Sequence, residues 1–339
     1  MKIPDVFIQK NFVAVVLVGA FLLLAPSPGR ATDTKKIRLA YAGWEAGTAI
    51  AYVGIDAGIF KKYELDVEEV FIRDALSGGV QSLIGVDLVV GSGNPIAILA
   101  PILGGADIVF LGSHASVDRY GMGVSDGITS IQELKKKKIG VSGLGGRSDL
   151  VARVILRRAG VAVGDVELIS AGLAPNRVAA LSKNLIQGTP INGRFIPEME
   201  KLGIKILEVK DVPIVTTLVM TTRSFLKKDE EAARRFMKGY LAATRYYLTH
   251  RAESIRIIRR YFSSAPPEAL ENMYDAFAAQ MAPYPIPNAE AVQSLIDSVL
   301  AVDPRAKNLK PVDLFDLRFL QELKTSGFID SLYAEKTSL

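Results

Sequence analysis

A strand, a glycine-rich loop and a helix are predicted in succession in KIGVSGLGGRSD, the segment from Lys138 to Asp149. Glycine lets the backbone approach a ligand closely, and the free N–H groups at the start of a helix favour an anion. The segment therefore predicts a receptor for a carboxylate, sulfonate or phosphate group. Its expected contacts are Ser142, Gly145, Gly146, Arg147 and Ser148. The alternative is that the glycines only form a tight turn between strand and helix.

Arg147 is the cationic candidate among the predicted contacts of this loop. A guanidinium group can bind an anionic head group through two parallel hydrogen bonds. The sequence leaves two alternatives open, an arginine that faces solvent and one that forms an ion pair between two lobes.

Further polar or aromatic residues follow other predicted strands, where the ligand contacts of a parallel sheet are expected. In chain order they are Trp44, Glu45, Ser92, Gly93, Asn94, Ser113, His114 and Asn192. Together with the loop residues above, they form the predicted ligand-binding set. No catalytic residue and no metal ligand is predicted.

Each of these residues also has a structural interpretation. Trp44 could stack on an organic ligand or pack in the core. Glu45 could meet a hydrogen-bond donor of the ligand or remain a solvated loop carboxylate. Asn94 and its neighbours could contact a ligand or cap the helix that Pro95 opens. His114 could contact ligand or serve as a structural or hinge histidine.

Apolar periodicity supplies the elements that would position these residues. Strands and helices alternate at short spacing, which indicates largely parallel sheets with helices on both faces. Expected strands cover 37–41, 65–71, 86–91, 107–111, 139–141, 166–170, 204–209 and 212–222, the last passing between two lobes. Expected helices cover 49–60, 75–84, 95–103, 148–159 and 175–186, and a long amphipathic segment runs from 229 to about 260.

The expected fold is α/β, with two lobes that each contain a mostly parallel sheet and a helical C-terminal part. We expect residues 32–115 and 216–339 to form lobe 1 and residues 116–215 to form lobe 2. Residues 1–31 are predicted to be a signal peptide, because a basic start precedes an apolar run of 14 residues and a break at Pro26 and Pro28. An uncleaved membrane anchor is the alternative.

Composition excludes several classes of function. The chain has no cysteine and two histidines, so thiolate chemistry and a histidine-rich metal site are excluded. Its net charge of +5 is too small to indicate nucleic-acid binding. The glycines at 143, 145 and 146 lack the complete G-x-G-x-x-G spacing, which argues against a dinucleotide cofactor. No cofactor is expected.

Three segments resemble one family of bacterial proteins. They are AYVGIDAGIFKKYELDVEEV (51–70), IQELKKKKIGVSGLGGRSDLVARVILRRAG (131–160) and DVELISAGLAPNRVAAL (165–181). In this order they resemble the ABC-transporter periplasmic solute-binding proteins for nitrate, taurine, aliphatic sulfonates and thiamine-pyrimidine precursors, the NMT1-like family. Two features depart from its pattern, the four lysines after Leu134 and the absence of an acidic residue in 188–192.

The resemblance implies a type II periplasmic binding fold that closes on a small solute between its lobes. It implies a monomer in the periplasm that delivers an organic, anionic solute to an ABC permease. The absence of cysteine predicts that this protein has no lipid anchor. The alternative is an enzyme on the same fold, of the dehydratase or pyrimidine-precursor type. The identity of the solute stays open.

Overall fold

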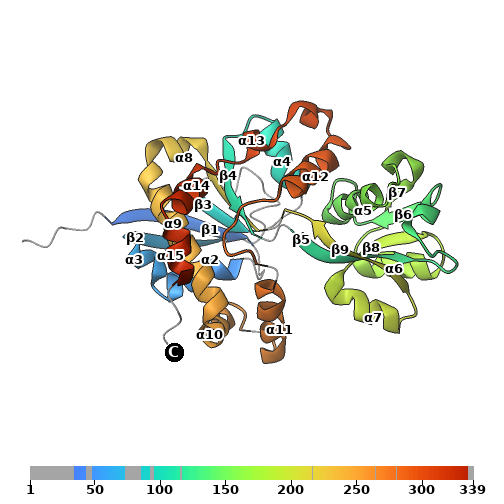
Figure 1. Ribbon diagram of the computed structural model, residues 1–339, viewed down its shortest axis with the longest axis horizontal. Helices are drawn as coiled ribbons and strands as arrows, with labels where there is room; N and C mark the ends of the chain where they lie inside the picture. The colour runs from blue at the N-terminus through green and yellow to red at the C-terminus, as the bar shows by residue number, and fades with distance from the viewer. Residues whose placement is uncertain are drawn as a thin grey trace, which may run out of the picture. The chain divides into compact units, whose positions relative to one another are not determined.

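Two five-stranded sheets organise the chain (Figure 1). The computed structural model describes residues 34–42, 48–72, 85–91, 95–114, 117–215, 217–263, 265–279 and 281–334. Residues from Lys35 onward form one compact unit.

The first sheet has the strand order β2-β1-β3-β10-β4. Its strands are β1 (Lys35–Ala42), β2 (Leu65–Ile72), β3 (Leu88–Gly91), β4 (Ile108–Ser113) and β10 (Leu218–Thr222). β1 is parallel to β2 and β3, whereas β10 is antiparallel to β3 and β4. β3 and β4 are buried along their whole length, which explains their nearly unbroken apolar sequences.

The second sheet has the order β7-β6-β8-β5-β9. Its strands are β5 (Val117–Val124), β6 (Lys138–Val141), β7 (Glu167–Ser170), β8 (Gly188–Asn192) and β9 (Lys205–Pro213). β6 is parallel to β7 and β8, and β5 is antiparallel to β8 and β9. Each sheet therefore combines parallel strands with antiparallel partners.

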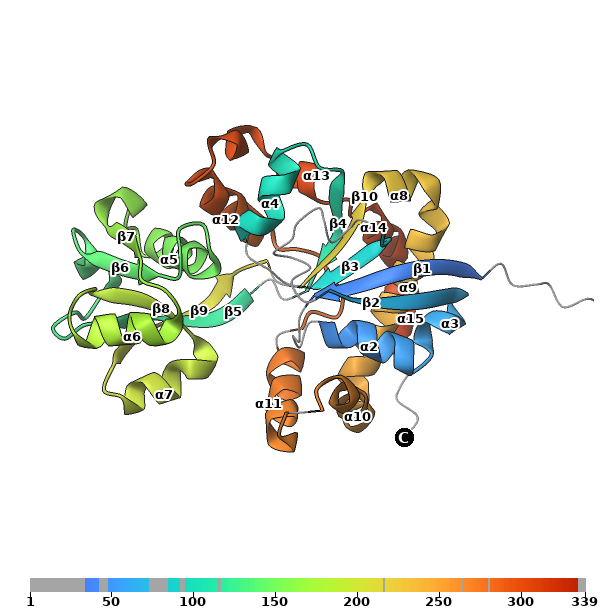
Figure 2. The same cartoon turned by 180° about the vertical axis from the view of Figure 1, so that it is seen from behind.

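Helices cover the faces of both sheets (Figures 1 and 2). They are α2 (Ala49–Asp56), α3 (Ile59–Lys62), α4 (Pro95–Leu103), α5 (Arg147–Arg158), α6 (Ala174–Ser182), α7 (Ile196–Lys201), α8 (Arg223–Lys228), α9 (Glu230–Thr249), α10 (Arg251–Tyr261), α11 (Pro267–Ala278), α12 (Ala289–Leu300), α13 (Pro311–Leu314), α14 (Arg318–Thr325) and α15 (Phe328–Ala334). α2 and α9 pack together beside β1. α12 contacts both α4 and α5.

Strand direction brings the chain connections of each sheet to one edge. β4 ends at Ser113 and β10 begins at Leu218, and because the two strands are antiparallel these ends lie at the same edge of the first sheet. In the second sheet, β5 begins and β9 ends at the edge where β6, β7 and β8 end. The carboxyl ends of the parallel strands therefore lie where the chain passes between the sheets.

The two sheets and their flanking helices agree with the predicted α/β class, but three predictions of secondary structure were incomplete or wrong. β5 was missed, because its sequence VDRYGMGV has two glycines and no clear alternation. The continuous strand over 212–222 is wrong, since β9 ends at Pro213 and β10 begins at Leu218. The helix over 229–260 is divided at His250, whose backbone leaves the helical region with φ −123° and ψ 66°. The predicted signal peptide and the helix over 75–84 lie outside the described residues.

Phe60 of α3 fixes the packing of α2 and α9 beside the first sheet. Its ring stacks on Phe236 with a centroid distance of 5.3 Å. A Cβ atom placed on Gly54 of α2 would lie 2.4 Å from this ring, and one on Gly239 of α9 would lie 2.7 Å from it. Glycine at both positions therefore makes room for the aromatic ring.

We expect Gly239→Val to lower the free energy of unfolding by about 2 kcal/mol, because the added side chain overpacks a core that the ring already fills. Gly164→Ala is the control, since a Cβ atom there meets no other atom within 4 Å, and it should change stability by less than about 0.5 kcal/mol. Urea unfolding followed by circular dichroism measures both. Equal stability of the two variants would contradict this packing.

Candidate functional site

The loop between β6 and α5 leads into the N-terminus of α5. Some of the backbone N–H groups there already donate hydrogen bonds to nearby atoms of the same segment. Gly145 adopts φ +74°, a conformation that favours glycine, and its N–H donates to Oδ2 of Asp149 at 2.8 Å. The N–H of Gly146 donates to the carbonyl of Gly143 at 3.1 Å. Both glycine N–H groups that the sequence predicts to face a ligand therefore already have hydrogen-bond partners in the loop or in the first turn of α5.

Ser142 and Ser148 join the end of β6 to the first turn of α5. The Ser142 N–H donates to Oγ of Ser148 at 2.7 Å, and the two hydroxyl oxygens are 2.8 Å apart. Ser148 is buried and Ser142 is half-buried. The two hydroxyls thus fix the turn, and the Ser142 hydroxyl has the greater exposure to solvent.

Asp149 was not predicted as a site residue, although it ends the segment that the sequence singles out. Its carboxylate is fully buried and forms an ion pair with Arg153, whose Nε lies 3.0 Å from Oδ2. The other oxygen, Oδ1, has no hydrogen-bond partner among the described residues. A carboxylate three residues after the helix cap is a recognisable N-terminal signal, which could have identified this role.

The start of α5 still retains positive character. No side chain caps the helix, so the N–H groups of Arg147, Ser148 and Asp149 have no partner among the described residues. The Arg147 side chain is half-buried, and none of the described residues forms a hydrogen bond or ion pair with it. Since Arg153 balances the charge of Asp149, Arg147 leaves the loop with an uncompensated positive charge.

Arg177 is a buried cation that was not among the residues predicted from the sequence. Its Nε donates to Oγ1 of Thr189 at 3.0 Å, and Nη1 donates to the carbonyl of Gly172 at 3.2 Å. The Thr189 hydroxyl in turn donates to the carbonyl of Gly140 at 2.9 Å. Burial lowers the pKa of Arg177. These hydrogen bonds connect the β7–α6 loop to β8. The role of Arg177 could not be predicted from the sequence, because its partners lie on separate elements that only the fold brings together.

Ser113 ends β4, His114 follows it directly, and both are buried. Their N–H groups donate to the carbonyls of Pro285 at 2.9 Å and Thr217 at 3.0 Å. Burial lowers the pKa of His114 to about 3, against a backbone hydrogen bond at Ala282 that raises it. The imidazole is therefore neutral at neutral pH, and these contacts favour the structural interpretation of His114.

The remaining predicted contacts divide into two groups. Asn192 ends β8, is half-buried and lies opposite Tyr120 of β5. The other predicted contacts lie outside the described residues: Trp44, Glu45, Ser92, Gly93 and Asn94. The structure thus brings Ser142, Arg147 and Ser148 together at the end of β6 and places Asn192 at the end of the neighbouring β8.

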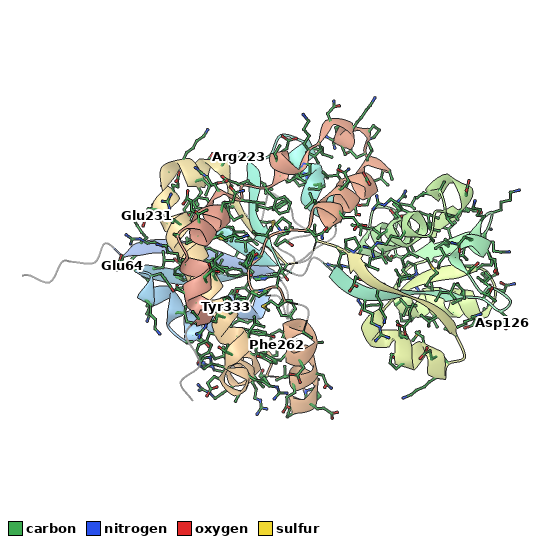
Figure 3. All side chains as sticks on the ribbon, viewed as in Figure 1. Glu64, Asp126, Arg223, Glu231, Phe262 and Tyr333 are labelled. Carbon is green, nitrogen blue, oxygen red and sulfur yellow. The ribbon has the colours of Figure 1, made fainter. Side chains whose placement is uncertain are left out.

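Aromatic residues from β1, α2 and the end of α10 pack together. Tyr41 is the second-last residue of β1 and packs edge-on against Tyr52, with centroids 4.8 Å apart. Tyr52 stacks on Tyr261 at 4.0 Å and lies beside Phe262, which Figure 3 labels. Burial and Glu69 raise the pKa of Tyr41, so this tyrosine stays protonated.

Two hollows in the described part of the chain contain none of the predicted contacts. One of about 400 Å³ lies along β5 and β9 and is lined by Arg119, Glu208, Lys210 and Asp211. The other, of about 530 Å³, lies at the amino ends of β6 and β8 and includes Asp126, labelled in Figure 3.

The described segments contain neither a metal-binding cluster nor a membrane-spanning helix. No group of three or more His, Asp or Glu side chains there could hold a metal ion. Every helix in the same segments is too short or too polar to cross a membrane.

A family model described as NMT1/THI5 like matches residues 46–254, which is more than half of the chain. The chain belongs to this family. The family predicted from the three sequence segments is thus confirmed. No curated protein sequence matches this NMT1/THI5-like chain.

Solved structures show the fold of this family member. The putative periplasmic sulfonate-binding protein SsuA from Methylobacillus flagellatus is 19% identical, with 87% of this chain and 97% of that chain covered and a TM-score of 0.62. The periplasmic aliphatic sulphonate binding protein SsuA from Escherichia coli is 18% identical, with 84% and 91% covered and a TM-score of 0.59. The predicted two-lobed periplasmic binding fold is confirmed.

A third similar structure is the DszB C27S mutant in complex with biphenyl-2-sulfinic acid. It is 13% identical, with 85% of this chain and 99% of that chain covered and a TM-score of 0.53. Because all three sequence identities are low, these comparisons show only the fold of this NMT1/THI5-like protein.

The lowered pKa of His114 predicts acid sensitivity. In the unfolded chain this histidine takes up a proton below about pH 6.5, whereas the folded protein resists protonation down to about pH 3. Its contribution to stability is therefore complete above pH 6.5 and is lost as the pH falls. Between pH 6.5 and 4.5 the free energy of unfolding of the wild type should fall by about 2 kcal/mol more than that of His114→Gln.

Urea unfolding at the two pH values measures this difference. The measured quantity is the change in unfolding free energy of each protein between the two pH values. A destabilisation by the substitution that is equal at both pH values therefore does not affect the result. Parallel losses in the two proteins would show that another group causes the acid sensitivity.

Proposed function

We propose that this protein is a periplasmic solute-binding protein that captures a small organic anion between two lobes. It would deliver the solute, as a monomer, to an ABC permease in the inner membrane. Membership of the NMT1/THI5-like family and likeness to the two SsuA structures support a solute-binding role in the periplasm. Export by an N-terminal signal peptide, without a lipid anchor, belongs to the same proposal.

One observation carries the proposal of an anionic solute. The first-turn N–H groups of α5 and the Arg147 guanidinium have no partner among the described residues and lie together at the carboxyl end of β6. The helix dipole and a guanidinium both favour a carboxylate, sulfonate or phosphate group. Ser142 and Asn192 would add hydrogen bonds from the ends of β6 and β8.

We propose the lobe boundaries that the sequence suggests. Lobe 1 would consist of residues 32–115 and 216–339, and lobe 2 of residues 116–215. Both connections between the sheets are short, and they attach at the carboxyl edges of the parallel strands. Loops from these edges would then line the solute site, and closure about the two connections would bring them together. Trp44, Glu45, Ser92, Gly93 and Asn94 would contribute the contacts of the first lobe.

Catalysis on this fold is the second candidate, because the DszB structure with its bound sulfinic acid is among those similar to the chain. The residue exchanged in that mutant was a cysteine, and this chain has none. His114 is fully buried, and His250 stacks on Tyr246 with ring centroids 4.0 Å apart. These features favour binding over turnover.

A thermal-shift screen of small sulfonates, carboxylates and phosphates should raise the unfolding temperature by several degrees for a solute present at about 100 times its dissociation constant. For the solute that gives the largest shift, Arg147→Ala should weaken binding about 10-fold, because a charged hydrogen bond is lost. Calorimetric titration measures the affinity.

Arg256→Ala is the matched control, since Arg256 is an exposed arginine on α10, away from the β6–α5 loop. Its affinity should equal that of the wild type. Unchanged affinity of Arg147→Ala would remove this residue from the site, and chemical conversion of the solute without any thermal shift would favour the enzyme.

A further inference from the structure

Helix α12 contacts elements of both proposed lobes. It contacts α4 and α13, which belong to proposed lobe 1, and it also contacts α5 and β9, which belong to proposed lobe 2. Figures 1 and 2 both show α12 between α4 and α5. A helix that touches both lobes affects how one lobe can move relative to the other.

Opposite faces of α12 differ in chemistry. Glu290, Ser294 and Asp297 recur at spacings of four and three residues, so they lie on one face of the helix. The opposite face is apolar and is buried in a cluster that extends from α4 and α13 to α5. Its residues are Val292, Leu295, Ile296 and Val299. The apolar face therefore makes α12 part of the core, and the polar face is left to form hydrogen bonds and ion pairs.

Two consecutive arginines at the end of α5 meet the polar face of α12. Arg157 donates from Nη1 to Oδ2 of Asp297 at 2.7 Å and from Nη2 to Oγ of Ser294 at 2.5 Å. Arg158 donates from Nε and Nη2 to the two carboxylate oxygens of Glu290, at 3.3 and 3.2 Å. Each guanidinium thus binds α12 through two hydrogen bonds, which fixes its orientation. We call these five residues the clasp.

Arg158 also holds the strand that leads from one sheet to the other. Its Nη1 donates to the carbonyls of Lys210 at 3.2 Å and Asp211 at 2.8 Å, both in β9. The register between β5 and β9 shifts at these two residues, and Asp211 adopts φ +55°. β9 ends at Pro213, and the chain then passes to β10 of the first sheet. One side chain therefore connects α12 to an irregular part of β9 next to the crossing between the sheets.

The apolar and polar contacts of α12 differ in how they respond to movement. Apolar packing is non-directional, and packed helices can slide over each other by small amounts. Hydrogen-bonded ion pairs require one alignment of their groups and weaken steeply when it is lost. The charged side chains of the clasp are all partly exposed, so water replaces their contacts when the pairs separate.

We propose that the clasp is a releasable connection between the lobes. Arg157 and Arg158 hold lobe 2 against α12 in one arrangement, and they separate from Glu290 and Asp297 when the hinge moves. The clasp thereby limits the range of lobe positions in the absence of solute. The inference rests on the proposed lobe boundaries and is independent of which solute the protein binds.

A distance measurement between two spin labels tests the clasp without any solute. The chain has no cysteine, so Lys62→Cys at the end of α3 and Lys183→Cys directly after α6 place one label on each proposed lobe. Both lysines are exposed. Pulsed dipolar spectroscopy then gives the distribution of interlobe distances. Arg157→Gln with Arg158→Gln should broaden this distribution, because lobe 2 is no longer held against α12.

Arg234→Gln with Arg251→Gln is the matched control. It also removes two partly exposed arginines that pair with carboxylates, but those partners lie in the same proposed lobe as the arginines. Its distribution should match that of the labelled parent protein. An unchanged distribution in the Arg157 and Arg158 variant, or equal broadening in both variants, would overturn the clasp and leave the proposed solute site standing.

Charge exchange distinguishes the clasp from a merely structural role of the arginines. Arg157→Asp places two carboxylates together and should broaden the distribution. Arg157→Asp with Asp297→Arg restores an ion pair at the same place and should narrow the distribution again. Circular dichroism checks that each variant is folded. Broadening that persists in the folded, exchanged variant would also overturn the clasp, because the ion pair would then not be what holds the lobes.

Discussion

The direction of the strands is the constraint on which the other features depend. The chain leaves the first sheet after β4 and returns before β10, and the two connections attach at the edge where the parallel strands end. All βα loops of the second sheet leave from its corresponding edge. Ser142 and Arg147 follow β6, whereas Asn192 ends β8, and the parallel direction of these two strands gathers the three residues there.

Charge at this edge is balanced unevenly. Asp149 occupies the first turn of α5, accepts the N–H of Gly145 and is compensated by Arg153. Part of the glycine-rich loop therefore stabilises the start of α5. This agrees with the alternative interpretation, in which the glycines form a tight turn between strand and helix. The N–H groups of the first turn and the Arg147 guanidinium are what remains for a ligand, so the proposed anion site and the turn are two parts of one structure.

Several elements could be predicted because their signals are local. Alternation and β-branched residues identify β1, β2 and β6, and glycines mark where their helices begin or end. β5 has glycines at 121 and 123 that pack against Ile206 and Ile191, so its sequence lacks the apolar alternation of a strand. The division of 212–222 into β9 and β10 was missed because this stretch of sequence is a continuous apolar and β-branched run with no glycine in it.

The sequence by itself determined the α/β class, the family and the importance of the segment from Lys138 to Asp149, because periodicity and glycine spacing are properties of short stretches. Only the tertiary structure decided which polar groups of that segment are already satisfied. The bonds of Gly145 to Asp149 and of Arg177 to Thr189 depend on side chains brought together by packing.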